Sequence, residues 1–176
     1  MTLSRKLRLA CLICLLLCTV GCDQISKHVA RAGLGQTSAF ALSGGLVEFR
    51  LAENPGSFLS LGAFLPSPAR FALFTLGVGV ALLALAAALL ARARVDLWRF
   101  MGLSLVLAGG MSNLLDRLLS HGLVTDFIAI RLGPFHTGIL NAADLLILIG
   151  IGVVICTFRK HWFPETPANQ WQRAGP

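Results

Sequence analysis

The stretch FALFTLGVGVALLALAAALLA, residues 71–91, contains no charged side chain and lies between Arg70 and Arg92. With a rise of about 1.5 Å per residue, a helix of this length covers the roughly 30 Å hydrocarbon core of a bilayer. No water in that core can satisfy backbone N–H and C=O groups, so a helix is the structure expected there. This stretch therefore predicts an integral membrane protein.

The composition of the whole chain agrees with that prediction. Of 176 residues, 56% are hydrophobic and only 13% are charged, whereas about a quarter of the residues in a soluble protein are charged. Mean hydropathy is +0.77. The net charge of +7 comes from Lys and Arg at the edges of apolar segments, which indicates contact with anionic lipid headgroups. We expect no nucleic-acid partner, because basic residues are not interleaved with aromatic ones.

Three more apolar segments flank the first. The N-terminal one is uncharged only over residues 9–22, so a spanning helix must continue past Asp23. We expect a membrane α-helical fold with a single integral membrane domain over residues 1–160, followed by a cytoplasmic tail, residues 161–176, without fixed structure. The four expected transmembrane helices are at about 7–29, 70–91, 97–118 and 138–158.

Basic residues predict the orientation of these helices. Clusters precede the first helix, separate the second from the third, and follow the fourth: Arg5, Lys6 and Arg8; Arg92, Arg94 and Arg99; Arg159, Lys160 and Arg173. Positive charge is retained on the cytoplasmic side of membranes. We therefore expect both termini in the cytoplasm and two outer loops, at about 31–69 and 119–137.

Both outer loops carry signals of β structure. Residues 46–51, LVEFRL, alternate between apolar and charged, and ENPGS at 53–57 is typical of a turn. The second loop contains β-branched residues that end at Gly133-Pro134. We expect a small extracytoplasmic β element from the first loop and a short hairpin-like segment from the second.

Polar and charged residues, whose insertion into a membrane costs free energy, gather at the outer ends of the expected helices. Within each helix they are spaced i,i+3 or i,i+4 and so share a face. For any single pair, a role in holding helices together is as good an explanation. Their convergence on one leaflet favours a functional site. The residues concerned are Asp23, Lys27, Asn113, Asp116, Arg117, Asp126, Asn141 and Asp144.

Two of these acids have no adjacent base in the sequence. Asp23 has Lys27 and Asp116 has Arg117, but Asp126 and Asp144 have no such neighbour. If these two meet in a partly dehydrated site, repulsion and desolvation leave them sharing one proton. One carboxylate can then activate water while the protonated one polarises a carbonyl, which is acid–base peptide hydrolysis. No metal, phosphate or dinucleotide motif appears, so we expect neither a metal nor a cofactor.

Five short motifs make the sequence recognisable: DQISK at 23–27, NPGS at 54–57, SNLLDR at 112–117, VTDFI at 124–128 and NAADL at 141–145. In this order the chain resembles bacterial lipoprotein signal peptidase, the type II signal peptidase family. The resemblance implies a four-helix aspartic protease of the bacterial inner membrane with a periplasmic β cradle. Such an intramembrane aspartic endopeptidase removes signal peptides from prolipoproteins by cleaving before a diacylglyceryl-modified cysteine.

The resemblance also implies roles for individual residues. The catalytic pair would be Asp126 and Asp144, near the periplasmic face. Residues implied to bind substrate are Asn54, Gly56, Asn113, Arg117 and Asn141. Residues implied to support the site are Asp23, Lys27 and Asp116. Diacylglyceryl-modified prolipoproteins and membrane lipids would be the partners of a monomeric enzyme.

The chain departs from the family pattern at three places. Ser112 stands where Gly is usual, Leu145 stands where a hydroxyl residue is usual, and residues 55–58 read Pro-Gly-Ser-Phe. These departures leave open a catalytically altered paralogue, or a membrane protein that binds lipidated peptides without cutting them. A small transporter or proton channel is the third alternative, but it predicts polar residues across the whole membrane depth.

The N-terminal segment allows one more reading. Residues 18–28, CTVGCDQISKH, follow a basic start and an apolar run, as in a removable lipoprotein signal. Thr19 stands where such signals favour Leu, and DQISK belongs to the family's first helix. We therefore expect a retained helix with Cys22 as a buried apolar residue. The five cysteines are expected to act as small apolar residues, without disulfides or metal.

Overall fold

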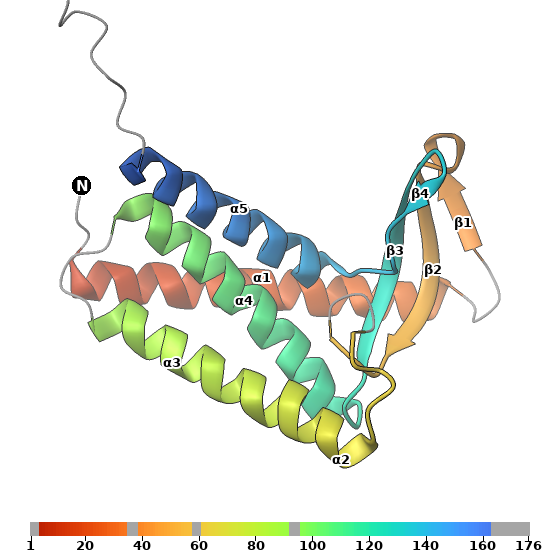
Figure 1. Cartoon of the computed structure of the whole chain (residues 1–176), viewed down its shortest axis with the longest axis horizontal. Helices are drawn as coiled ribbons and strands as arrows, with labels where there is room; N and C mark the ends of the chain where they lie inside the picture. Colours follow the sequence, from red (N-terminus) through yellow and green to blue (C-terminus); the bar gives the residue numbers. More distant parts are fainter. Residues whose placement is uncertain (1–3, 35–38, 58–60, 92–95, 163–176) are drawn as a thin grey trace, which may run out of the picture.

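The computed structural model of the chain describes residues 4–34, 39–57, 61–91 and 96–162. Its long helices run side by side, and a small sheet stands at one end of them (Figure 1). In chain order the described helical elements are α1 (Arg5–Gly33), the short 3-10 helix η1 (Ser43–Gly45), α2 (Ser67–Arg70), the π-helical η3 (Phe71–Gly77), α3 (Val78–Ala91), α4 (Leu97–Leu119) and α5 (Ala142–Trp162). Of these helices, α1 and α4 end at the sheet and α5 starts there, so all three can contribute to a site at that end (Figure 1).

Side chains at their N-caps start three of the helices. The Ser4 hydroxyl accepts a hydrogen bond from Leu7 N, and the Asp96 carboxylate accepts one from Arg99 N at 3.2 Å. Both satisfy N–H groups that have no partner inside the helix. Asn141 does the same for α5, where it also contacts the polar residues described below.

Small residues bring α4 and α5 close together. A Cβ placed on Gly109 would lie 2.6 Å from the carbonyl oxygen of Ala143, and one on Gly102 would lie 2.8 Å from that of Gly150. Only glycine permits this approach, which is how helices pack in membranes, where burying apolar side chains gives little driving force. This packing fixes the start of α5 against α4.

The sheet joins the two outer loops. Its strands are β1 (Ala39–Leu42), β2 (Val47–Asn54), β3 (Val124–Leu132) and β4 (Phe135–His136), paired in that order and antiparallel throughout. In the central pair, Ala52 lies opposite Asp126 and Asn54 opposite Val124, and the register is irregular between Phe49 and Ala52. A strand in each loop was predicted, but no local pattern indicates that these strands pair with each other.

The helix predictions agree with the structure except at the ends. The first helix extends from Arg5 to Gly33 rather than 7–29, and the last begins at Ala142 rather than 138 because Asn141 caps it. Within the described residues, two helices are long and apolar enough to cross a membrane, Arg5–Gly33 and Ser67–Ala91. The prediction of four spans remains a prediction for α4 and α5.

Two smaller expectations concern Cys22 and the tail. Cys22 is exposed on the surface of α1, so its predicted burial was wrong: the helix turns Asp23 inward and Cys22 outward. The helix α5 ends at Trp162, and the rest of the predicted tail, residues 163–176, lies outside the described residues.

Candidate active site

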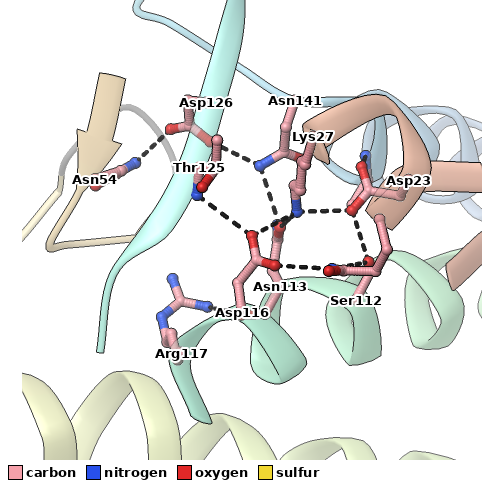
Figure 2. A network of polar contacts seen from close by, with 12 residues as sticks. Asp23, Lys27, Asn54, Ser112, Asn113, Asp116, Arg117, Thr125, Asp126 and Asn141 are labelled. Atoms are coloured by element: carbon pink, nitrogen blue, oxygen red, sulfur yellow. Dashed lines mark hydrogen bonds and ion pairs between the residues drawn. The ribbon is translucent and has the colours of Figure 1, made fainter. Parts of the chain in front are cut away.

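The polar residues singled out in the sequence meet where the sheet stands on the helices (Figure 2). They come from α1, α4, the end of β2, the start of β3 and the first turn of α5. All of them are buried, and Lys27 and Asn141 have no exposed surface at all. Buried polar groups are costly unless they are paired, so their partners define the site.

Asn141 and Asp144 cap the first turn of α5 reciprocally. The Asn141 side-chain oxygen accepts from Asp144 N at 2.9 Å, and Asp144 Oδ2 accepts from Asn141 N at 3.2 Å. This is the capping-box arrangement, in which an N-cap side chain and the side chain three residues later satisfy each other's backbone N–H. The local sequence NAAD therefore fixes the Asp144 carboxylate at the N-terminal end of a helix, where negative charge is favoured.

Asp126 is held by two side-chain amides from other elements. Asn141 Nδ2 donates to its Oδ1 at 2.7 Å, and Asn54 Nδ2 donates to its Oδ2 at 2.9 Å. Burial, together with the negative charge of Asp144, raises the pKa of Asp126 to about 6, against the lowering effect of the two amide hydrogen bonds and of Lys27. This carboxyl group therefore changes charge near neutral pH.

Asn113 links the two sides of the cluster. Its Nδ2 donates to Asp144 Oδ1 at 2.9 Å, while its Oδ1 accepts from Asn141 Nδ2 at 3.1 Å and from Lys27 Nζ at 3.0 Å. A single amide thus connects a buried cation with the Asp144 carboxylate. Both the donor and the acceptor atoms of Asn113 are used, which fixes the orientation of its side chain.

Lys27 lies between two carboxylates. Its Nζ is 2.6 Å from Asp23 Oδ2 and 2.8 Å from Asp116 Oδ2. With the bond to Asn113, all three ammonium protons have acceptors. Neutral groups add donors to the carboxylates: Ala143 N to Asp23 Oδ1 at 2.9 Å, and Gln24 Nε2 to Asp116 Oδ1 at 2.7 Å.

Arg117 and Gly56 contact each other at the edge of the site. Arg117 Nη2 donates to Gly56 O at 2.9 Å, and Nη1 donates to Asn113 O at 3.2 Å. Gly56 N in turn donates to Asn54 Oδ1 at 2.9 Å. The arginine therefore connects α4 to the turn after β2, and so to the amide that holds Asp126.

The carboxylates of Asp126 and Asp144 line the same cavity, which has a volume of about 270 Å³. Asn54, Asn113 and Arg117 also line it. Its other described walls are mainly apolar and come from η3–α3, α4 and α5, including Val78, Gly110, Ile147, Leu148 and Ile151. Of the predicted substrate-binding residues, Gly56 and Asn141 lie behind this lining, where they contact its side chains.

Comparison with known proteins assigns the family. The family profile described as signal peptidase (SPase) II matches residues 15–160. The chain belongs to the signal peptidase II family. It is 37% identical to a lipoprotein signal peptidase of Nostoc punctiforme over 141 residues, covering 78% of this chain and 83% of that protein. A lipoprotein signal peptidase of Treponema denticola is 33% identical over 141 residues, or 74% and 80% of the two chains.

The fold has a counterpart of known structure. A bacterial membrane enzyme determined at 2.3 Å resolution superposes with a TM-score of 0.77 at 23% identity, covering 89% of this chain and 92% of that one. At this level of identity the likeness concerns the fold. The signal peptidase II assignment rests on the sequence comparisons.

Sequence reasoning missed several contacts of the site in this signal peptidase II chain. Gln24 lies inside the DQISK motif, but an uncharged residue between two charged ones gave no signal. Thr125 N donates to Asp116 Oδ2 at 3.3 Å, and a backbone donor carries no signature in a sequence. Ser112 was noted as a departure from the family pattern, yet its partner could not be identified.

Proposed function

We propose that this chain removes signal peptides from prolipoproteins as an aspartic endopeptidase, with Asp126 and Asp144 as its catalytic pair. Family membership supports the substrate class. Two carboxylates that line one cavity and share Asn141 as a hydrogen-bonding neighbour support the chemistry. That shared neighbour is the observation on which the proposal depends, because it brings together acids from two separate elements.

The proposed reaction is hydrolysis of the peptide bond before a diacylglyceryl-modified cysteine. One carboxylate takes a proton from water as the water oxygen attacks the carbonyl carbon, and the protonated partner donates to the carbonyl oxygen. The C–N bond then breaks and the released amine receives a proton from the pair. A pKa of about 6 for Asp126 suits such a shared proton, and apparent values belong to the pair as a unit.

Each carboxylate is oriented before substrate arrives. Asp126 accepts from Asn54 and Asn141, and Asp144 accepts from Asn113 and from a backbone N–H. Groups fixed in advance need little reorganisation as charge moves during reaction. We propose that Asn113, Asn141 and Asn54 act mainly by this orientation, with Arg117 and Gly56 shaping the turn that closes over the cleavage site.

The cavity has the mixed character expected for the substrate. A signal peptide is apolar, and the diacylglyceryl group can remain in the bilayer while the peptide bond that precedes the cysteine enters the cavity. Apolar walls from Val78, Ile147 and Ile151 face the carboxylates and Arg117 across the same space. We propose that the apolar walls receive side chains of the signal peptide and that the polar side aligns the scissile bond.

We further propose that α1, η3–α3, α4 and α5 all span the bacterial inner membrane. The N-terminal end of α1 lies at the opposite end of the helices from the sheet (Figure 1). The basic cluster at the start of α1 favours the cytoplasm, so the sheet and the cavity would lie at the periplasmic face. Asp116 and Arg117 of α4 and Asp144 of α5 would then face the protein interior, as their burial requires.

The test is cleavage of a diacylglyceryl-modified prolipoprotein by the purified chain in detergent, followed by mass spectrometry of both products. We expect cleavage before the modified cysteine, and loss of it in Asp126→Asn and in Asp144→Asn. Asp96→Asn is the matched control, because Asp96 caps the far end of α4 and Asn is an equally good N-cap. It should cleave like wild type.

Two outcomes would reject parts of the proposal. Wild-type rates in Asp126→Asn or Asp144→Asn would remove that residue from the catalytic pair. Binding of the modified prolipoprotein without cleavage by the wild-type chain would favour the non-enzymatic alternative. The structure gives that alternative little support, since neither Ser112 nor Leu145 is among the described residues that line the cavity.

A further inference from the structure

The hydroxyl of Ser112 lies fully buried between α4 and α1 (Figure 2). Its Oγ donates to Asp23 Oδ2 at 2.6 Å and accepts from Gln24 Nε2 at 3.3 Å. The donor distance is that of a charge-assisted O–H···O⁻ hydrogen bond, which is about twice as strong as a neutral one. A glycine, the residue usual at this position in the family, could not supply it.

Asp23 connects Ser112 of α4 to the first turn of α5. While Oδ2 accepts from Ser112 and Lys27, Oδ1 accepts from Ala143 N at 2.9 Å. Ala143 directly precedes Asp144, and its N–H is one of those that a helix start leaves without an internal partner. Asp23 is thus a cap for α5 supplied by another helix.

The charge around Asp23 makes its neutral donors important. Asp23 and Asp116 share the single ammonium of Lys27, so the three groups together carry an excess of negative charge. Without the hydroxyl, Asp23 Oδ2 would keep only Lys27. The carboxylate would be free to turn toward that ammonium and away from Ala143 N, and a buried carboxylate that loses a donor is strongly disfavoured.

We propose that Ser112 is a positioning residue for catalysis: its hydroxyl fixes Asp23, and Asp23 fixes the turn of α5 that carries Asp144. The kinetic part of this inference rests on the proposed function. A second series of hydrogen bonds reaches the Asp144 carboxylate through side chains: Lys27 donates to Asn113, and Asn113 donates to Asp144 Oδ1. The series that begins at Ser112 acts instead on the backbone, because Asp23 accepts from Ala143 N. It therefore fixes the position of the first turn of α5.

The test compares Ser112→Ala with Ser112→Thr, which keeps a hydroxyl, and with Ser104→Ala as a matched control. Ser104 lies on the same helix and is equally buried, but its Oγ has no hydrogen-bond partner among the described residues. In the cleavage assay we expect kcat to fall about ten-fold in Ser112→Ala with KM changed by less than about two-fold. Ser112→Thr should recover most of kcat, and Ser104→Ala should match wild type.

Hydrogen exchange of the detergent-solubilised chain gives a readout that does not depend on activity. We expect faster exchange in Ser112→Ala for the peptide covering Asn141 to Leu145, with no change for peptides of α3. If the wild-type chain cleaves nothing, the proposed function fails, while this measurement still tests the positioning role. Unchanged exchange in that peptide, or an unchanged kcat in an active Ser112→Ala, overturns the inference. Should Ser112→Thr be too large to fold, Ser112→Ala against Ser104→Ala still decides it.

Discussion

Asn141 donates its side-chain amide to Asp126 at 2.7 Å while its side-chain oxygen caps the helix that begins beside it. One residue therefore performs two tasks: it starts α5 at the position that presents Asp144, and it holds the carboxylate that comes from β3. This side chain joins the N-terminal end of α5 to the start of β3, beside the backbone hydrogen bonds of Leu140 with Phe127 and Ile128. Its two tasks can be separated by substitution.

Asn141→Ser should keep the helix and lose the activity. Serine is about as good an N-cap as asparagine, so stability should fall only through the lost amide bonds to Asp126 and Asn113. The serine side chain has no amide to donate to Asp126, however, and cleavage should therefore fall about a hundred-fold. Asn141→Ala should lose activity and be about 1 kcal/mol less stable than Asn141→Ser, because alanine also removes the cap. Cleavage rates and melting temperatures in one detergent measure both effects. Equal activity of Asn141→Ser and wild type would contradict the bridging role.

The stability of the chain should depend on pH through Asp126 in the direction opposite to that of an ordinary salt-bridged acid. Its pKa is raised from 3.8 to about 6, so the folded chain keeps this proton where the unfolded chain has lost it. The stabilisation is fully present below about 3.8 and is lost as the pH rises to about 6. The melting temperature of wild type minus that of Asp126→Asn should therefore fall between these values and then level off. A difference that grows with pH over that window would contradict the assignment.

Much of the fold could be predicted because its strongest signals are local. An uncharged stretch such as residues 71–91 predicts a helix whatever surrounds it. The start of α5 was placed too early because residues 138–140 are nearly as apolar as the helix. Leu140 is in fact paired with Ile128 of β3, and the helix begins only where Asn141 can cap it. Hydropathy cannot distinguish these two states of an apolar residue.

The partners of the site residues could be predicted only in part. The shared leaflet and the helical spacing brought Asp126 and Asp144 to the same region, and the structure places both on one cavity. The contacts that hold them join residues far apart in the chain, such as Ser112 with Asp23 and Asn54 with Asp126. A local pattern indicates that a buried polar residue needs a partner, but it does not say which one.

Gly109→Ala should separate α4 from α5 next to the proposed catalytic pair. Its new Cβ would lie 2.6 Å from Ala143 O and 2.8 Å from Ile147 Cγ1, so the first turn of α5 must move. Overpacking of this kind costs about 1–3 kcal/mol, and we expect cleavage to fall with it because Asp144 adjoins Ala143. Gly152→Ala is the matched control on α5, since a Cβ there meets nothing within 4 Å. Melting temperature and cleavage rate measure both, and equal effects of the two substitutions would contradict this packing argument.

Lys27→Met should be more damaging than Asp116→Asn, although each removes one charge from the same cluster. Without the ammonium, Asp23 and Asp116 remain buried as two uncompensated carboxylates, and breaking a buried pair in this way costs about 3–5 kcal/mol. Asp116→Asn instead leaves Lys27 paired with Asp23 alone, a neutral pair that keeps its bond to Asn113. Thermal unfolding in detergent should therefore rank Lys27→Met well below Asp116→Asn, and the double variant should recover part of the loss. If Asp116→Asn proved the less stable of the two, the excess negative charge would not be what Lys27 compensates, and the bonds from Gln24 and Thr125 to Asp116 would have to hold the cluster together.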